Sequence, residues 1–228
     1  MRFPRTGRSL GWLYVATMLP APLNLAFLPS HFLVPGDAAA TAARIAAEPM
    51  LYRICTLAGL VNNILFVVLA LALFRLFQEV DRSQARLLVL LVVLSAAVGL
   101  VTLVFEAGPL IVLNGKDYWS AFTKPQLDAL VMGLVALRGT GLGIDSAFWG
   151  LWLLPFGILV WKSGFMPKLI GVLLIIGCVG YLMQSFTAVL WPAQVHKVFN
   201  ATLPLVGPGE IAVSLWLIVK GKKIPVPA

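Results

Sequence analysis

The sequence predicts an all-α fold, a polytopic six-helix transmembrane bundle with a short outer surface helix and a broken fourth span. Of the 228 residues, 60% are hydrophobic and only 11% are charged, whereas ordinary soluble domains carry about 25% charged residues. Six apolar stretches are also long enough, at about 20 helical residues each, to cross about 30 Å of hydrocarbon. A water-soluble fold is therefore excluded, and most of the surface must contact membrane lipids.

The apolar stretches place the spans in order along one transmembrane domain, residues 1–228. They lie near residues 9–34, 49–73, 87–113, 139–161, 169–191 and 199–219. Prolines within the first and sixth spans predict kinks or breaks there, because proline removes a helical hydrogen bond that neighbouring helices must replace. These prolines are Pro20, Pro22 and Pro29 in the first span, and Pro204 and Pro208 in the sixth.

The outer connections have structure of their own. Residues 36–49 are rich in alanine, with Asp37 suited to an N-cap and Pro49 to a stop, so they predict a short surface helix. Residues 125–137 are apolar but cannot simply extend the fourth span, because a helix over 125–161 would be about 55 Å long. We therefore expect a break at residues 138–141, RGTG, with an outer half-helix before it.

The net charge of +8 indicates how the chain is oriented in the membrane and does not indicate contact with nucleic acid. Eleven basic residues precede the first span, follow the sixth or lie between spans two and three or four and five, and four lie on the opposite side. The positive-inside rule then places both termini in the cytoplasm. The eleven are Arg2, Arg5, Arg8, Arg75, Arg82, Arg86, Lys162, Lys168, Lys220, Lys222 and Lys223.

Polar side chains inside the spans are the most informative feature, because each ionisable one costs a few kcal/mol in hydrocarbon. Helical spacing places them on one face of spans two to five, as expected for the inner face of a bundle. They are candidates for a ligand-binding site or for structural ion pairs. The candidate residues are Arg53, Asn63, Glu106, Arg138, Asp145, Trp149, Gln184 and Glu210.

Several of these residues need partners from other helices. Arg138 and Asp145 share a face but are about 10.5 Å apart along the helix, so we expect Glu106 to pair with Arg138 and Arg53 to pair with Asp145. If the sixth span restarts at Pro208, the amides of its new N-terminus lie beside Glu210, which suits a carboxylate.

The sequence gives no sign of catalysis or of a cofactor. We assign its two histidines, His31 and His196, to the outer loops, and Cys55 and Cys178 sit alone in apolar runs. No hydrolase, metalloprotease or nucleotide-binding motif is present. We predict no catalytic residue, no metal, no cofactor and no nucleic-acid partner, and the oligomeric state stays open.

Three segments together resemble a bacterial membrane-protein family, domain of unknown function 4386. They are the stretch from GDAAATAARIAAEPMLYRICTLAGL to LALALFRLFQEVDRSQARL, then AFWGLWLLPFGILVWKSGFMPKLIGVLLIIGCVGYL, and finally GEIAVSLWLIVKGKK. The resemblance covers residues 8–223 and implies a six-helix protein of the bacterial inner membrane. It implies no activity, and where it implies a histidine near the start of the fourth span this chain has Arg138.

Two hypotheses of function follow. The leading one is binding or transport of a small amphipathic or anionic ligand through an outward-facing polar pocket, with the arginines attracting the ligand and the carboxylates orienting it or carrying protons. The alternative is a structural or regulatory membrane subunit whose intramembrane charges only hold the bundle together. An intramembrane enzyme that uses Asp145 and Glu106 as an acid/base pair is disfavoured, because nucleophile and metal candidates are both lacking.

Overall fold

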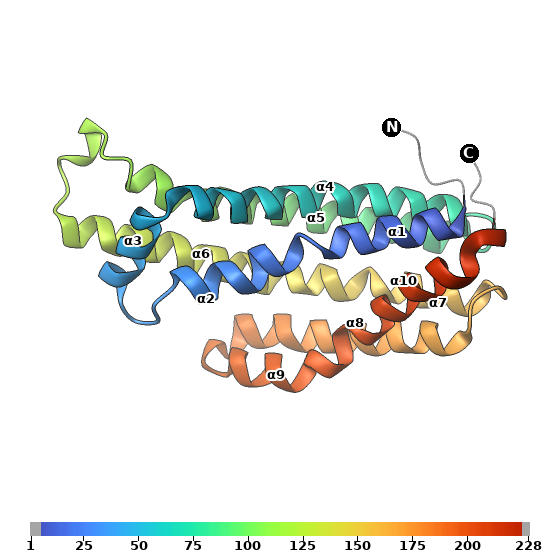
Figure 1. Ribbon diagram of the computed structural model, residues 1–228. Helices are drawn as coiled ribbons and strands as arrows, with labels where there is room; N and C mark the ends of the chain where they lie inside the picture. The colour runs from blue at the N-terminus through green and yellow to red at the C-terminus, as the bar shows by residue number, and fades with distance from the viewer. Residues whose placement is uncertain (1–5, 225–228) are drawn as a thin grey trace. The chain divides into compact units, whose positions relative to one another are not determined.

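The computed structural model describes residues 6–224 and confirms an all-α fold (Figure 1). Within the described residues, 6 helical segments are long and apolar enough to cross a membrane. Five of them match the predicted spans to within a few residues at most ends, and the fourth begins earlier than predicted. The segments are Gly7–Phe32, Pro49–Phe77, Arg82–Val112, Lys124–Lys162, Lys168–Leu190 and Pro192–Lys220.

Breaks and caps divide these segments into shorter elements. The α-helices are α1 (Gly7–Met18), α2 (Leu28–Phe32), α3 (Ala38–Ala47), α4 (Pro49–Phe77), α5 (Arg82–Val112), α6 (Lys124–Leu151), α7 (Leu153–Lys162), α8 (Lys168–Leu190), α9 (Val195–Val206) and α10 (Pro208–Lys220). Short turns of other helical types are η1 (Leu23–Phe27), η2 (Asp117–Trp119), η3 (Pro192–Gln194) and η4 (Gly221–Lys223).

The first and sixth spans are interrupted at their prolines, as predicted. In the first, α1 ends at Met18 and the chain passes through the π-helical turn η1 before α2. In the sixth, α9 ends at Val206 and α10 restarts at Pro208, the first helical position, where the missing amide hydrogen costs nothing.

The fourth span is broken, but the predicted position of the break was wrong. Residues 138–141 lie within the regular helix α6, and the interruption falls at Trp152. Glycine in a helix interior costs only about 1 kcal/mol, so Gly139 and Gly141 do not end the helix. Pro155 lacks an amide hydrogen and cannot bond the carbonyl of Leu151, which accounts for the break one turn before it.

The predicted outer surface helix is confirmed as α3. Asp37 caps it, since its side chain accepts a hydrogen bond from the amide of Ala40 at 2.8 Å. Pro49 does not merely stop this helix, because it is also the first residue of α4.

The chain divides into two compact units. Within the described residues, unit 1 comprises residues 6–17, 64–98 and 143–224, and unit 2 comprises residues 18–63 and 99–142. Each unit holds its own group of polar side chains, described below. That residues 1–228 form one domain stays a prediction.

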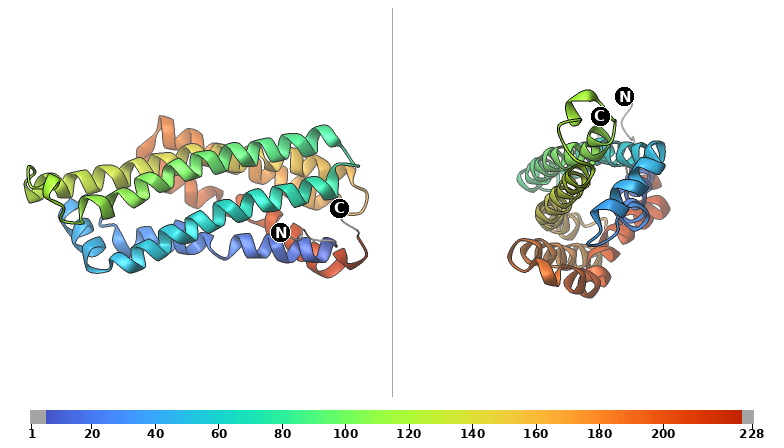
Figure 2. Two further views of the ribbon diagram at one scale, coloured as in Figure 1. Left: turned by 90° about the horizontal axis from the view of Figure 1, so that it is seen from above. Right: turned by 90° about the vertical axis from the view of Figure 1, so that its left-hand side faces the viewer.

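Unit 1 is built on close helix packing. α7 and α9 each lie along α8, and α10 contacts α8 as well (Figures 1 and 2). Glycine permits this approach where α7 meets α8: a Cβ atom on Gly157 would lie 2.7 Å from the carbonyl oxygen of Gly171. Small residues at such crossings are the usual way in which membrane helices pack, because backbones then approach closely.

Unit 2 has an apolar core that joins the ends of α2, α3, α4, α5 and α6. The edge-to-face contact of Phe32 with Tyr52, at 5.1 Å between ring centroids, lies in this core. The buried members of the core are Leu28, Phe32, Ala42, Ile45, Tyr52, Cys55, Val112 and Val131.

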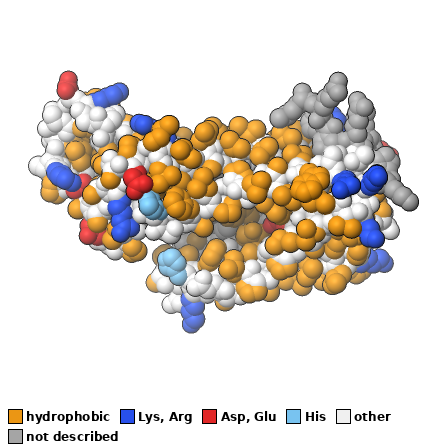
Figure 3. All heavy atoms as spheres, viewed as in Figure 1, with side chains coloured by type: hydrophobic (Ala, Val, Ile, Leu, Met, Phe, Trp, Pro, Cys, Tyr) orange, Lys and Arg blue, Asp and Glu red, His pale blue; other side chains and the backbone are white. Residues whose placement is uncertain are grey.

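The exterior of the spans is apolar. Large hydrophobic side chains such as Val104 and Val219 are each 69% exposed, and hydrophobic atoms dominate the face seen in Figure 3, while most charged side chains lie near helix ends. Such an exposed apolar surface on long helices is that of a multi-pass membrane protein in contact with lipid.

Candidate functional site

Glu106 on α5 and Arg138 on α6 form a buried ion pair in unit 2. The Nε atom of Arg138 donates to Oε2 of Glu106 at 2.5 Å, and the two side chains are 5% and 1% exposed. The predicted pairing of Glu106 with Arg138 is therefore found.

Asn24 completes this ion pair, and the sequence analysis missed it. Its side-chain amide donates to both carboxylate oxygens of Glu106, at 2.8 and 3.0 Å, and to the carbonyl oxygen of Cys55 at 3.0 Å. The Nη2 atom of Arg138 in turn donates to the backbone oxygen of Asn24 at 2.7 Å. Both charges are thus neutralised and hydrogen-bonded inside one network, the condition for a tolerable buried pair.

The local backbone explains how Asn24 reaches the pair. Asn24 lies in the wide turn η1 that follows Pro20 and Pro22, where the amides of Leu23 and Asn24 both bond the carbonyl of Pro20. Gly59 on α4 leaves room for it, since a Cβ atom there would lie 2.9 Å from the side-chain nitrogen of Asn24. The signal in the sequence was a lone asparagine in an apolar run between prolines. The π-helical turn that positions it is of a kind that recurs at functional sites.

Tyr52 connects α4 to the same hydrogen-bond network. Its hydroxyl donates to the backbone oxygen of Glu106 at 2.9 Å, and the side chain is fully buried. The network therefore joins η1, α4, α5 and α6 of unit 2. The guanidinium of Arg138 forms its ion pair and its hydrogen bond within this network.

Arg53 does not join the buried polar groups. It lies on α4, and its side chain is exposed and takes part in no ion pair within residues 6–224. The expectation that Arg53 faces the bundle interior was wrong, because Tyr52 and Cys55 take up the buried side of this turn of α4.

Asp145 on α6 belongs to unit 1 and has neutral partners. The hydroxyl of Ser95 on α5 donates to its Oδ1 at 2.7 Å. Trp149, one turn further along α6, lies close enough for its indole N–H to interact with the same carboxyl group. Asp145 is 3% exposed, and none of the ion pairs among the described side chains includes it.

Glu210 lies in the first turn of α10, just after the break in the sixth span. The hydroxyl of Tyr14 on α1 donates to its Oε2 at 3.1 Å, and the phenol of Tyr181 on α8 is a second titratable group close to it. Gly209 brings this turn against α8, since a Cβ atom on it would lie 2.8 Å from the backbone nitrogen of Leu174.

Each of the two carboxyl groups of unit 1 has an aromatic neighbour, and these two neighbours contact each other. The rings of Trp149 and Tyr181 meet edge to face, with centroids 6.0 Å apart and an interplanar angle of 81°. Trp149 is the neighbour of Asp145 and Tyr181 is the neighbour of Glu210. Unit 1 thus brings together Asp145, Trp149 and Glu210, all predicted, with Tyr14 and Tyr181, which were not.

The remaining predicted site residues make contacts that hold helices together. Gln184 on α8 donates to the hydroxyl of Thr202 on α9 at 2.8 Å. The amide of Asn63 donates to the carbonyl of Gly59 in its own helix at 3.0 Å, and its oxygen packs against Gly99. Within the described part of the chain, no group of three His, Cys, Asp or Glu side chains could hold a metal ion.

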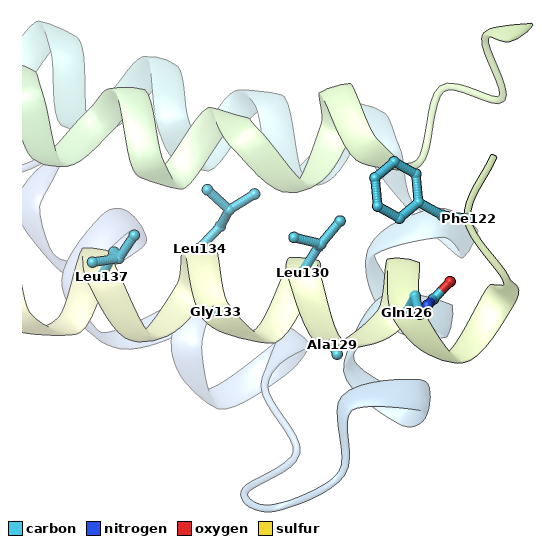
Figure 4. Close-up of a pocket in the computed structure, with 7 residues that line it drawn as sticks. All are labelled: Phe122, Gln126, Ala129, Leu130, Gly133, Leu134 and Leu137. Atoms are coloured by element: carbon cyan, nitrogen blue, oxygen red, sulfur yellow. The ribbon is translucent and has the colours of Figure 1, made fainter. Parts of the chain in front are cut away.

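An open apolar groove runs along α6 in unit 2 (Figure 4). Its volume is about 640 Å³, and Gly133 leaves its floor open, with no atom within 4 Å of where a Cβ would lie. None of the predicted polar residues lines it. The lining residues are Phe122, Gln126, Ala129, Leu130, Gly133, Leu134 and Leu137.

These features define a class before they define a family: a multi-pass helical membrane protein with a buried Glu–Arg ion pair and, among the described side chains, two carboxyl groups within its spans that take part in no ion pair. The model of domain of unknown function 4386 matches residues 9–221. The chain belongs to this family.

An uncharacterized protein of Archaeoglobus fulgidus is similar to part of the chain. The two are 31% identical over 86 residues, which is 36% of this chain and 48% of the archaeal protein. The match thus spans about half the length of this curated relative. No solved structure matches the chain.

Proposed function

We propose that this membrane protein binds or transports a small amphipathic ligand at Glu210 in unit 1. The observation that carries the proposal is the state of the Glu210 carboxyl group. Its Oε2 accepts a hydrogen bond from Tyr14, while Oε1 accepts none from the residues that the structure describes. Glu210 is half-buried, so one oxygen of a partly buried carboxyl group is left for a ligand.

The surroundings of Glu210 suit an amphipathic molecule. The hydroxyl of Tyr14 donates to the carboxyl group, the phenol of Tyr181 lies close to it, and Trp149 packs on Tyr181. A few polar groups among aromatic side chains are typical of small-molecule sites. A carboxyl group beside a broken helix within a span is also where membrane transporters place their binding sites.

An anionic ligand receives less support than an amphipathic one. Arg138, the arginine expected to attract an anion, is committed to Glu106 and Asn24, and Arg53 lies on the exposed face of α4. We therefore place the ligand in unit 1 and assign the charges of unit 2 to stability.

The orientation proposed from the basic residues is retained. Both termini would lie in the cytoplasm of a bacterial cell, with the protein in the inner membrane and the pocket facing outward. A cysteine introduced into η2, which follows α5, should then react with a membrane-impermeant maleimide added to intact cells.

A thermal-shift panel tests the proposal. Purified protein in mild detergent is heated with small amphipathic amines, alcohols and acids, and a ligand at a hundredfold excess over its Kd should stabilise the fold by about 2.7 kcal/mol. We expect at least one compound to raise the Tm of the wild type and to have little effect on Glu210→Gln. The proposal fails if no compound shifts the wild type.

The alternative function, a structural or regulatory membrane subunit, is supported by the saturated ion pair of unit 2. It requires the Glu210 contacts to be structural as well. In that case Glu210→Gln should lower the Tm without any ligand present, about as much as Glu106→Gln does.

A further inference from the structure

We propose that the ligand at Glu210 is a small amphipathic cation, and that it binds in exchange for the carboxyl proton of Glu210. This inference rests on the proposed function and adds to it the charge of the ligand and the ion released. The geometry of unit 1 supports it in three steps.

The first step is charge. Glu210 lies inside a span, and none of the ion pairs found among the described side chains includes it. The titratable groups that face it are the phenols of Tyr14 from α1 and Tyr181 from α8. An anion without a cation is expensive in hydrocarbon, so the site needs one positive charge, which either a bound proton or a cationic ligand supplies.

The second step is the position of the proton. Tyr14 donates to Oε2 at 3.1 Å, so Oε1 is the oxygen that can carry a hydrogen without breaking this bond. When the proton leaves to water, the carboxylate keeps the Tyr14 hydrogen bond and Oε1 is free to face the ligand. The O–H bond of the carboxyl group breaks, an ion pair forms, and the net charge of the site is unchanged.

The third step is the aromatic surround. The faces of Tyr and Trp rings attract organic cations within about 6 Å, and the attraction is strongest where water is absent. Tyr14 is 1% exposed and contacts Phe156 with ring centroids 6.4 Å apart, while Tyr181 packs against Trp149. Aromatic side chains near Glu210 suit an organic cation better than an anion.

Asp145 acts in this scheme as a positioning residue. Trp149 lies one turn further along α6 and interacts with its carboxyl group, and the hydroxyl of Ser95 donates to its Oδ1 at 2.7 Å. Asp145→Asn should therefore weaken binding moderately while the release of a proton on binding persists.

Three probes of one shape test the charge. Benzyltrimethylammonium carries a permanent positive charge, neopentylbenzene is its neutral isostere, and benzenesulfonate is an anion of similar size. Each is titrated by calorimetry into purified full-length protein in mild detergent. We expect benzyltrimethylammonium to bind at least about tenfold more tightly than the other two, the fold-change that a charge-assisted contact provides.

Proton release is measured in the same samples. In weak buffer with a pH indicator, about one proton should appear per bound benzyltrimethylammonium at mildly acidic pH, and binding should tighten as the pH rises. Glu210→Gln should lose the release, whereas Glu79→Gln, the same change at an exposed turn after α4, should keep it.

The outcomes separate the two proposals. If the neutral or anionic probe binds as tightly as the cation, or if the cation binds without releasing a proton, the exchange is overturned and the proposed function stands. If no probe and no compound of the thermal panel binds, both fall. The comparison of the three probes uses wild-type protein alone, so it holds even if Glu210→Gln fails to fold.

Discussion

Two glutamates within the spans have opposite surroundings. Glu106 in unit 2 faces the guanidinium of Arg138 and the amide of Asn24, and it is 1% exposed. Glu210 in unit 1 accepts a hydrogen bond from the phenol of Tyr14, lies close to the phenol of Tyr181, and has one oxygen without a hydrogen bond from the described residues. Because a buried ion pair is costly to disrupt, the first glutamate is fixed in one state, whereas the second can exchange its partner.

The largest expected effect comes from making the same change at both glutamates. Glu106→Gln leaves the Arg138 guanidinium buried without its counter-ion and should cost about 3–5 kcal/mol of stability. Glu210→Gln keeps an oxygen to accept the Tyr14 hydroxyl and should cost at most about 1 kcal/mol. Thermal unfolding of the two variants in mild detergent measures both losses of stability.

A double variant checks the reason for that difference. Replacing the pair with Glu106→Leu and Arg138→Met removes both charges together, and such apolar replacements are often neutral or stabilising. Most of the lost stability should return. Equal losses in Glu106→Gln and Glu210→Gln would contradict the division of roles between the two units.

The ion pair also shows how much of the fold and of the site can be predicted from the sequence. Counting apolar stretches located all six spans, and the seven-residue separation of Arg138 and Asp145 correctly indicated that Arg138 needs Glu106 from another helix. The contact of Asn24 with the ion pair was not predicted, because it depends on the π-helical turn after Pro20, a backbone detail that helical periodicity does not encode.

The other misses have physical reasons as well. Arg53 fits the polar sector of its span by angle, but Tyr52 beside it takes the buried position and bonds Glu106. The break in the fourth span followed the proline at 155 rather than the glycines at 139 and 141, because proline removes a hydrogen bond and glycine does not. The phenols near Glu210 come from helices far apart in the sequence, which no local pattern connects.

A second prediction weighs the two side-chain amides of unit 2. Asn24→Ala removes donors to a buried carboxylate and to the Cys55 carbonyl and should cost about 1.5–3 kcal/mol. Asn63→Ala, whose amide bonds only the Gly59 carbonyl of its own helix, should cost about 1 kcal/mol or less. Denaturant unfolding of both variants in detergent measures the gap, and equal losses would show that Asn24 does not support the ion pair.

A third prediction compares glycines beside the two sites. Gly209→Ala would place a Cβ atom 2.8 Å from the backbone nitrogen of Leu174, and such overpacking costs about 1–3 kcal/mol. Gly133→Ala enters open space at the floor of the α6 groove and should add up to about 1 kcal/mol through helix propensity. Opposite shifts in Tm are expected, and a loss in both would mean that the groove is occupied.

The smallest expected effect lies outside the spans, at the turn between α4 and α5. The Lys162 ammonium hydrogen-bonds Asp81 at 2.7 Å and, with the amides of Gln84 and Ser83, holds the pKa of Asp81 below its ordinary value of about 3.9. A depressed pKa in the folded state stabilises the protein above the unfolded-state pKa, and this contribution is lost as the pH falls through the folded value.

The Tm should therefore drop slightly more on acidification below about pH 4 in the wild type than in Asp81→Asn. Because the pair is accessible to water, salt should reduce the difference. Lys162→Ala should retain part of the pH dependence, since the Gln84 and Ser83 amides still bond the carboxylate. A melt series in which wild type and Asp81→Asn lose stability in parallel would show that this ion pair, unlike that of Glu106, contributes nothing to the fold.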